Sequence, residues 1–210
     1  IISIQNKALE LSLFLSIPAT IALFIASNLI VSALFGYGSF SETSVENSAQ
    51  ALFYFAFGLP AFSLIKVFSS FFFARHDTKT PFYISLFSVL LNILISVSLF
   101  QKVGFIIIPI ATSISSWSNA IFLYIFSKKK NLFLFNDNFI YRFPRILLSS
   151  LIMGLIFYFL LNLLSEKLIY SENLKFIYLL LSISIALVSY VVVSIFTKAF
   201  KMSDINLKYK

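Results

Sequence analysis

The chain has 210 residues, of which 60% are hydrophobic and only 11% are charged, and its mean hydropathy is +0.96. A soluble domain carries roughly 25% charged residues, so this composition excludes an ordinary soluble fold. The net charge of +8 does not indicate nucleic-acid binding, because the basic residues lie between apolar segments rather than on one solvated face. Since Cys is absent, disulfides and thiolate metal sites are excluded.

Six apolar runs with almost no charged residues follow one another along the chain. Each run is close to the roughly 20 residues that a helix needs to cross a bilayer core, whereas barrel strands alternate in polarity over about ten residues. Lipid offers no partner to unpaired backbone groups, which also favours helices. The predicted fold class is an all-α, polytopic transmembrane helical bundle. Its six transmembrane helices lie at 11–35, 49–74, 81–100, 104–126, 146–164 and 176–196.

The connections between these runs contain cap residues. Gly36 follows the first run at the position of a helix C-cap, and residues 43–46 have the spacing of a capping box. The second helix is therefore expected to start before its apolar part. Thr80 followed by Pro81 predicts the N-cap and first residue of the third helix.

Lys66 is the one ionic residue inside a predicted span. Placing an ammonium at that depth costs at least about 2.5 kcal/mol on insertion scales, so Lys66 needs a partner or water. One interpretation is a substrate-binding cation that lines a wet path for an anion. The alternative is a structural Lys bonded to another helix or to carbonyls freed by a kink at Pro60. Pro18 and Pro109 are also expected to lie at kinks or near helix ends.

Four polar residues in the third and fourth spans form a second candidate site. Asn92 and Ser96 share one helix face, and Thr112 and Asn119 lie on the next span. Their oxygens could bind a monovalent cation between the helices, but contact between the two helices is the more common role of such residues. Because no carboxylate accompanies them, the pattern indicates a cation site only weakly, and contact between the helices is the favoured interpretation.

The predicted spans contain no Asp, Glu or His, which argues against catalysis. The sole His, His76, lies beside Asp77 in a predicted loop, where adjacent side chains usually point apart. We therefore expect no catalytic residue, no metal site and no cofactor.

The basic residues predict the orientation. Twelve of the 16 Lys and Arg residues lie on one side of the predicted spans, three lie on the other side, and Lys66 is inside. The three are Lys102, Lys167 and Lys175, and the twelve are Lys7, Arg75, Lys79, Lys128, Lys129, Lys130, Arg142, Arg145, Lys198, Lys201, Lys208 and Lys210. The positive-inside rule therefore places both ends of the chain in the cytoplasm.

The charge distribution also divides the chain. We expect a four-helix part at 1–126, a basic cytoplasmic connection at 127–145, a terminal helix pair at 146–197 and a basic tail at 198–210. Because the chain does not begin with Met, we expect it to be part of a longer protein.

Several short motifs stand out in the first four spans and their connections. They are GLPAF at 58–62 followed by Lys66 and Val67, and FARHDTKTP at 73–81. Upstream lie IPA at 17–19 and LFGYGSF at 34–40, and downstream lies the segment 104–124, which includes Trp117. Together these segments resemble the MurJ/MviN family of lipid II flippases. The resemblance covers residues 8–126, whereas the last two spans match mainly in number and placement.

This resemblance implies the last six of about fourteen helices in a two-lobed fold of the multidrug/oligosaccharidyl-lipid/polysaccharide exporter superfamily. Such a protein moves lipid II, an undecaprenyl-pyrophosphate-linked peptidoglycan precursor, to the outer leaflet of the bacterial cytoplasmic membrane by alternating access. The implied partners are lipid II, membrane lipids and a missing N-terminal lobe. That lobe and one helix just upstream would hold the family's essential arginines. The terminal helix pair would extend a groove for the lipid tail.

Two other functions stay open from the sequence. One is an exporter of drugs or of other polyprenyl-linked saccharides in the same superfamily, and the other is a noncatalytic membrane scaffold. A scaffold should tolerate the loss of Lys66, whereas a drug exporter should respond to soluble drugs rather than to lipid II.

Overall fold

The computed structural model describes residues 2–199, so Lys201, Lys208, Lys210 and most of the expected basic tail lie outside the described residues. Within that range the chain folds into seven α-helices joined by short connections, two of which contain a 3-10 turn. The helices are α1 (Ile2–Phe35), α2 (Glu42–Ala56), α3 (Leu59–Phe73), α4 (Lys79–Val103), α5 (Ile107–Lys129), α6 (Asp137–Leu163) and α7 (Lys175–Phe196).

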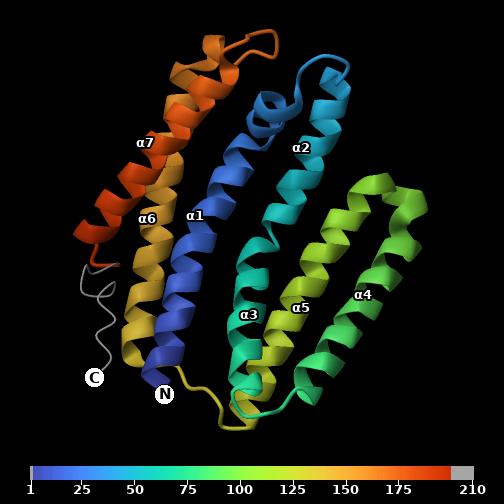
Figure 1. Ribbon diagram of the computed structural model, residues 1–210, viewed down its shortest axis with the longest axis vertical. Coiled ribbons are helices and arrows are strands. Elements are labelled where there is room, and N and C mark those ends of the chain that lie inside the picture. Colours follow the sequence, from blue (N-terminus) through green and yellow to red (C-terminus); the bar gives the residue numbers. More distant parts are fainter. Residues whose placement is uncertain (1, 200–210) are drawn as a thin grey trace.

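These helices confirm the predicted all-α class and its six membrane crossings. The helices α2 and α3 form one span that is bent by 40° at a short break. The apolar stretch Lys79–Lys129 contains two crossings, because α4 and α5 fold back on each other as a hairpin (Figure 1). Gly104 lies at the turn of this hairpin with φ of +75°, a conformation that glycine adopts without a steric penalty.

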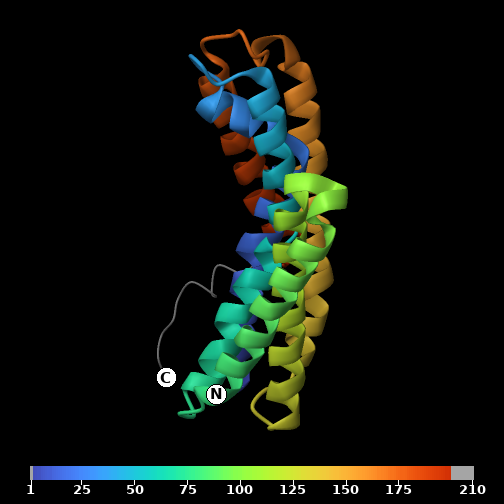
Figure 2. The same ribbon diagram turned by 90° about the vertical axis from the view of Figure 1, so that its right-hand side faces the viewer.

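The helices stand side by side in a thin layer. Across Figure 1 the order is α7, α6, α1, the α2–α3 pair, α5 and α4, and Figure 2 shows the same layer from its narrow side. The connections 74–78 and 130–136 lie at the lower end, whereas 36–41 and 164–174 lie at the upper end. Most large apolar side chains on the outer helix faces are exposed, as expected for a surface in contact with lipid.

Two clusters of buried side chains hold the layer together. One joins α1, α6 and α7 around Met153 and Phe157, and the other joins α1, α3, α5 and the 130–136 connection around Phe72 and Phe133. In the first cluster α6 approaches α1 closely at Gly154. A Cβ atom there would lie 2.6 Å from Ile21 Cγ2, so a larger residue would push the two helices apart.

The helix starts differ in detail from the predicted caps. The helix α2 begins before its apolar part, as expected, but its N-cap is Ser41, whose Oγ accepts a hydrogen bond from the Ser44 amide at 3.2 Å. The capping box at 43–46 was therefore wrong by two residues, because the Ser41 hydroxyl already reaches the open amide. The predicted C-cap position of Gly36, immediately after α1, is confirmed.

The third predicted helix also starts earlier than expected. The helix α4 begins at Lys79, and the Asp77 carboxylate accepts hydrogen bonds from the Thr80 amide at 3.0 Å and the Thr80 hydroxyl at 2.8 Å. Thr80 as the N-cap and Pro81 as the first helical residue were therefore wrong. The physical reason is that Asp77, three residues before Thr80, satisfies the open amide.

The prolines follow the prediction in part. Pro109 lies in the first turn of α5, near a helix end as expected, and Pro60 is the second residue of α3, at the 40° bend of the second span. In α1 the non-helical backbone occurs at Ala26 rather than at Pro18. Pro18 still leaves the Phe14 carbonyl without its helical donor, and the Tyr190 hydroxyl of α7 donates to that carbonyl at 2.7 Å.

Candidate functional site

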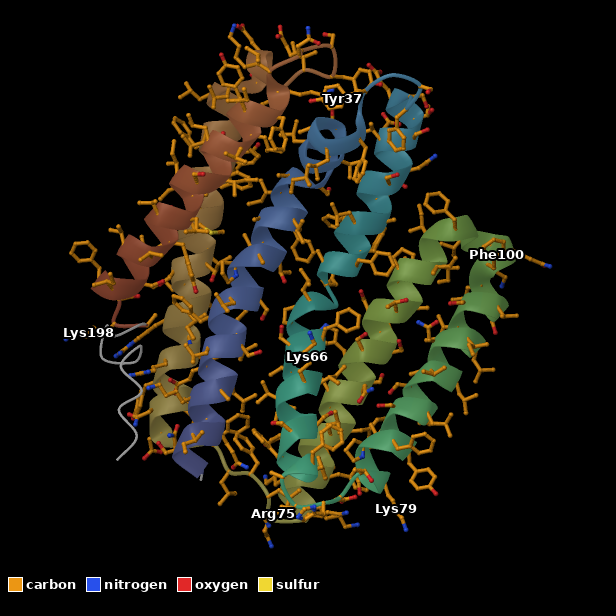
Figure 3. All side chains as sticks on the ribbon, viewed as in Figure 1. Tyr37, Lys66, Arg75, Lys79, Phe100 and Lys198 are labelled. Atoms are coloured by element: carbon orange, nitrogen blue, oxygen red, sulfur yellow. The ribbon has the colours of Figure 1, made fainter. Side chains whose placement is uncertain are left out.

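Lys66 lies about halfway along α3 with an exposed side chain (Figure 3). Within the described part of the chain, its ammonium has no hydrogen-bond or ion-pair partner. The face of α3 that carries Pro60, Leu64 and Phe68 lines the largest groove described below, and Lys66 is not among the residues of that groove. Its role as a substrate-binding cation stays a prediction.

The carbonyls at the break before Lys66 already have partners from α5. At the break the Gly58 amide bonds to the Phe55 carbonyl, which leaves the Tyr54 carbonyl without its helical donor. The Ser113 hydroxyl donates to the Tyr54 carbonyl at 2.6 Å, and the Trp117 indole N–H donates to the Phe57 carbonyl at 2.8 Å. The carbonyl that Pro60 itself frees is that of Ala56, four residues earlier, and Lys66 donates to none of these carbonyls within residues 2–199.

Two of the four polar candidates meet between α4 and α5. The Asn92 amide nitrogen lies 3.1 Å from Thr112 Oγ1 and 3.3 Å from Ser115 Oγ, and it donates to both. The Thr112 hydroxyl in turn donates to the Ile108 carbonyl at 2.8 Å. This arrangement is an interhelical contact.

The other two candidates lie at different depths along the same pair of helices. Asn119 donates to Ser85 Oγ at 3.4 Å, and Ser85 precedes Asn92 by two helical turns, roughly 10 Å along α4. The Ser96 hydroxyl and the Asn119 side-chain oxygen are buried without a hydrogen-bond partner among the described residues. The four positions therefore do not converge on one point, and monovalent cation binding at any of them stays a prediction.

An apolar groove of about 630 Å³, which we call the central groove, lies between the helices. The helices α1, α3, α5 and α6 line it together with the connection before α6. The side chains are Leu9, Leu13, Ile17, Thr20, Ile21, Phe24, Pro60, Leu64, Phe68, Trp117, Ala120, Ile121, Tyr124, Phe135, Phe139, Phe143, Leu147 and Leu151. Such a surface suits an apolar chain and offers almost no partner for a charged group.

A second apolar groove of about 330 Å³, the lateral groove, lies on the other side of α1. It includes residues of both terminal helices, with Met153 and Phe157 from α6 and Ile183, Leu187 and Tyr190 from α7. The terminal helix pair thus contributes to an apolar groove. Binding of a lipid tail there stays a prediction.

Lys175 is a buried cation whose environment the sequence did not indicate. It was predicted to be a loop residue, but it begins α7 and is only 1% exposed. Its ammonium donates to the Gly36 carbonyl at 2.7 Å and to the Tyr170 carbonyl at 2.6 Å. It also lies 4.4 Å and 4.5 Å from the ring centroids of Tyr37 and Tyr170. Tyr170 is five residues away, but Gly36 and Tyr37 come from a loop about 140 residues earlier, so no local pattern could have revealed the complete site.

Glu10 is a second charged residue that the analysis of the spans missed. The helix α1 begins nine residues before the predicted span, so Glu10 lies within it and is largely buried. Arg142 Nη1 donates to Glu10 Oε2 at 2.8 Å, which joins α1 to α6. Arg142 had been counted only as a loop cation. Each charge of the pair compensates the other, and neither residue lines the central groove or the groove on the other side of α1.

Comparison with known proteins gives one consistent family. The family described as "Lipid II flippase MurJ" matches residues 1–180. A probable lipid II flippase MurJ of Rickettsia prowazekii is 40% identical over 128 residues, which are 61% of this chain and 25% of the relative. A probable lipid II flippase MurJ of Rhizobium meliloti is 35% identical over 156 residues, or 74% of this chain and 29% of the relative.

A solved structure agrees with these sequence matches. It is titled lipid II flippase MurJ in the inward closed conformation, and it superposes with a TM-score of 0.75 at 29% sequence identity. The match covers 92% of this chain and 38% of the solved chain. This chain therefore spans about a quarter of the curated relatives it matches.

Proposed function

Because the chain belongs to the lipid II flippase MurJ family, we propose that it forms part of a flippase that moves lipid II from the inner to the outer leaflet of the cytoplasmic membrane. The observation that carries this proposal is the family match over residues 1–180. A transporter function agrees with the polytopic helical fold. It also agrees with the sequence, which gives little indication of catalytic residues.

The chemistry of lipid II gives each part of the site a role. A polyprenyl tail needs an apolar surface, and the central and lateral grooves both offer one within the membrane-spanning helices. A pyrophosphate needs cations, and Lys66 is an exposed cation on α3 without an ion-pair partner among the described residues. We assign the tail to the grooves and the pyrophosphate to the Lys66 side of α3.

The proposed orientation has both ends of the chain in the cytoplasm. The lower connections carry Arg75, Lys79 and the run 128–130, which the positive-inside rule assigns to that side. Of the three basic residues at the upper end, Lys175 is buried in its carbonyl and tyrosine site, so Lys102 and Lys167 are the exposed ones.

The same family assignment implies a partner. Since this chain spans about a quarter of its curated relatives, the substrate path is expected to be completed by the remaining helices of such a protein. We propose that the exposed faces of α4 and α5 and the Lys66 side of α3 contribute one wall of that path.

A chimera tests the function. The segment of the Rickettsia relative that matches this chain is replaced by the corresponding residues of this chain, and the chimera is expressed in cells depleted of their own lipid II flippase. We expect growth to be restored and lipid II to appear in the outer leaflet. A chimera that reaches the membrane in normal amounts but moves no lipid II would refute the proposal.

The same chimera separates the alternatives. A drug exporter would show transport stimulated by soluble drugs and unaffected by lipid II. A scaffold would restore growth with no lipid II translocation in purified vesicles. Either result would replace the flippase assignment.

A further inference from the structure

The lower end of the α3–α4–α5 group carries a set of basic side chains that the transport proposal does not use. They are Arg75 and Lys79 from the α3–α4 connection and Lys128 and Lys129 from the last turn of α5. We call these four residues the basic end. In Figure 3 the labelled Arg75 and Lys79 extend beyond the lower ends of the helices. All four are exposed, and none has a hydrogen-bond or ion-pair partner within residues 2–199.

A specific contact brings these two segments together although they are about 50 residues apart. The Lys130 ammonium lies 2.6 Å from Asp77 Oδ2 and 2.8 Å from Thr80 Oγ1, and it donates to both. It also lies 6.0 Å from the ring centroid of Phe72. Asp77, Thr80 and Lys130 therefore form a clamp that holds the end of α5 against the start of α4.

In the clamp, Lys130 neutralises the charge of Asp77, which is the one negative charge of the two segments. Asp77 is the only acidic residue in 74–80 and 127–131. The hydrogen bond from Lys130, helped by the Thr80 amide, lowers the pKa of Asp77 from 3.8 to about 2, so the carboxylate is ionised at neutral pH and paired with Lys130. The four remaining cations are left uncompensated. Their combined field favours an anionic ligand.

Exposed aromatic side chains surround the same end. They are Phe73 at the end of α3, Phe82 and Tyr83 in the first turns of α4, and Phe126 near the end of α5. Trp and Tyr gather where a membrane protein crosses the lipid headgroup region, and Tyr83 is of this type. The uncompensated cations lie at or just beyond the ends of the membrane-spanning helices α3, α4 and α5, which is the depth of the phospholipid phosphates.

From this arrangement we propose that the basic end is a binding surface for anionic phospholipid headgroups, with Arg75, Lys79, Lys128 and Lys129 in contact with the phosphate. Asp77, Thr80 and Lys130 are positioning residues that hold the two segments together. The partner is a membrane lipid rather than a soluble phosphate, because the cations lie at the ends of membrane-spanning helices, beside Tyr83, at the membrane interface. This proposal does not depend on the transported substrate.

Lipid binding to the purified chain can be counted by native mass spectrometry in neutral detergent. We expect phosphatidylglycerol to bind more tightly than phosphatidylcholine, and inorganic phosphate not to displace it. Near a membrane surface each cation contributes about 1 kcal/mol, or about a fivefold change in affinity. Lys128→Gln with Lys129→Gln should therefore weaken phosphatidylglycerol binding about 25-fold. The matched control is Lys102→Gln with Lys167→Gln, which removes the same charge elsewhere and should have little effect.

Variants of the clamp distinguish a binding surface formed by the two joined segments from a general attraction by positive charge. Asp77→Asn makes the chain more positive, so a general field predicts equal or tighter binding, whereas separation of the two segments predicts weaker binding. Thr80→Val tests the same contact without any change in charge and should also weaken binding. Circular dichroism confirms that each variant is folded. Unchanged or tighter binding in both variants, equal losses in the matched control, or displacement by inorganic phosphate would overturn the proposal.

Discussion

Lys66 and Lys175 show how the surroundings of a lysine decide its role in a membrane protein. Both were visible in the sequence, and Lys66 was the more conspicuous because it interrupts an apolar run. In the structure Lys175 is the buried one, with two carbonyl oxygens and two tyrosine rings around its ammonium, whereas Lys66 is exposed. The surroundings of Lys175 therefore indicate a structural role, whereas a substrate-binding role for Lys66 stays a prediction.

The role of Lys66 can be tested in the chimera described above. Lys66→Met keeps most of the apolar stem and removes the charge, so we expect lipid II translocation per folded molecule to fall while membrane abundance stays normal. Lys66→Arg should retain more activity than Lys66→Met, although the shape and hydration of a guanidinium differ from those of an ammonium. Unchanged translocation per molecule in Lys66→Met would contradict a role in the substrate path.

Lys175 should matter for stability instead. Lys175→Met leaves the Gly36 and Tyr170 carbonyls without their donor, and a buried acceptor left unsatisfied costs about 1–3 kcal/mol. We expect a lower thermal unfolding midpoint in detergent. Lys167→Met, at an exposed position in the same connection, should change the stability by less than about 0.5 kcal/mol. Equal midpoints for the two variants would show that the buried site does not stabilise the fold.

At the scale of helices, proline breaks are stabilised by side chains from neighbouring helices. The Phe14 carbonyl, freed by Pro18 in α1, accepts from Tyr190 of α7, and the carbonyls at the α2–α3 break accept from Ser113 and Trp117 of α5. Each irregular helix is thus fixed to a different neighbour. An irregular span in lipid needs such partners, because no water replaces the missing backbone hydrogen bonds.

A double-mutant cycle tests the contact between α1 and α7. Tyr190→Phe removes only the hydroxyl, and hydrogen bonds inside membrane proteins contribute about 0.6 kcal/mol on average and about 1.7 kcal/mol at most. Pro18→Ala restores an amide donor for the Phe14 carbonyl, so Tyr190→Phe should cost much less in that background. Stability is measured by unfolding in mixed micelles. Equal costs in the two backgrounds would show that the tyrosine does not compensate for the proline.

For the whole molecule, the clearest prediction is the topology. The chain contains no Cys, so single cysteines can be placed at Ser48, which is exposed near the upper end, and at Lys129, which is exposed at the basic end. A membrane-impermeant thiol reagent added to intact cells should label Ser48→Cys and leave Lys129→Cys unlabelled. Both positions should react in broken membranes. Preferential labelling at Lys129→Cys in intact cells would reverse the proposed orientation.

The sequence by itself determined the helical class, the six crossings and the family, because hydrophobic length and short motifs are local properties of the chain. The runs at 104–126 and 176–196 needed no knowledge of their neighbours to be identified as spans. The expected early start of α2 was also correct. The same local information predicted that Lys66 was unusual, although it could not say which groups lie around it.

The tertiary structure alone decided which groups satisfy each buried polar atom. At the starts of α2 and α4 the Ser41 hydroxyl and the Asp77 carboxylate, rather than the predicted caps, accept hydrogen bonds from open amides. Asn92 and Asn119 were separated in depth by the antiparallel pairing of α4 and α5. Lys175 was buried by loops about 5 and 140 residues away. The Asn92, Asn119 and Lys175–Gly36 contacts join residues 20 or more positions apart, and no short window of sequence contains both partners. The two caps and the Tyr170 contact are local, and they depend on where each helix begins.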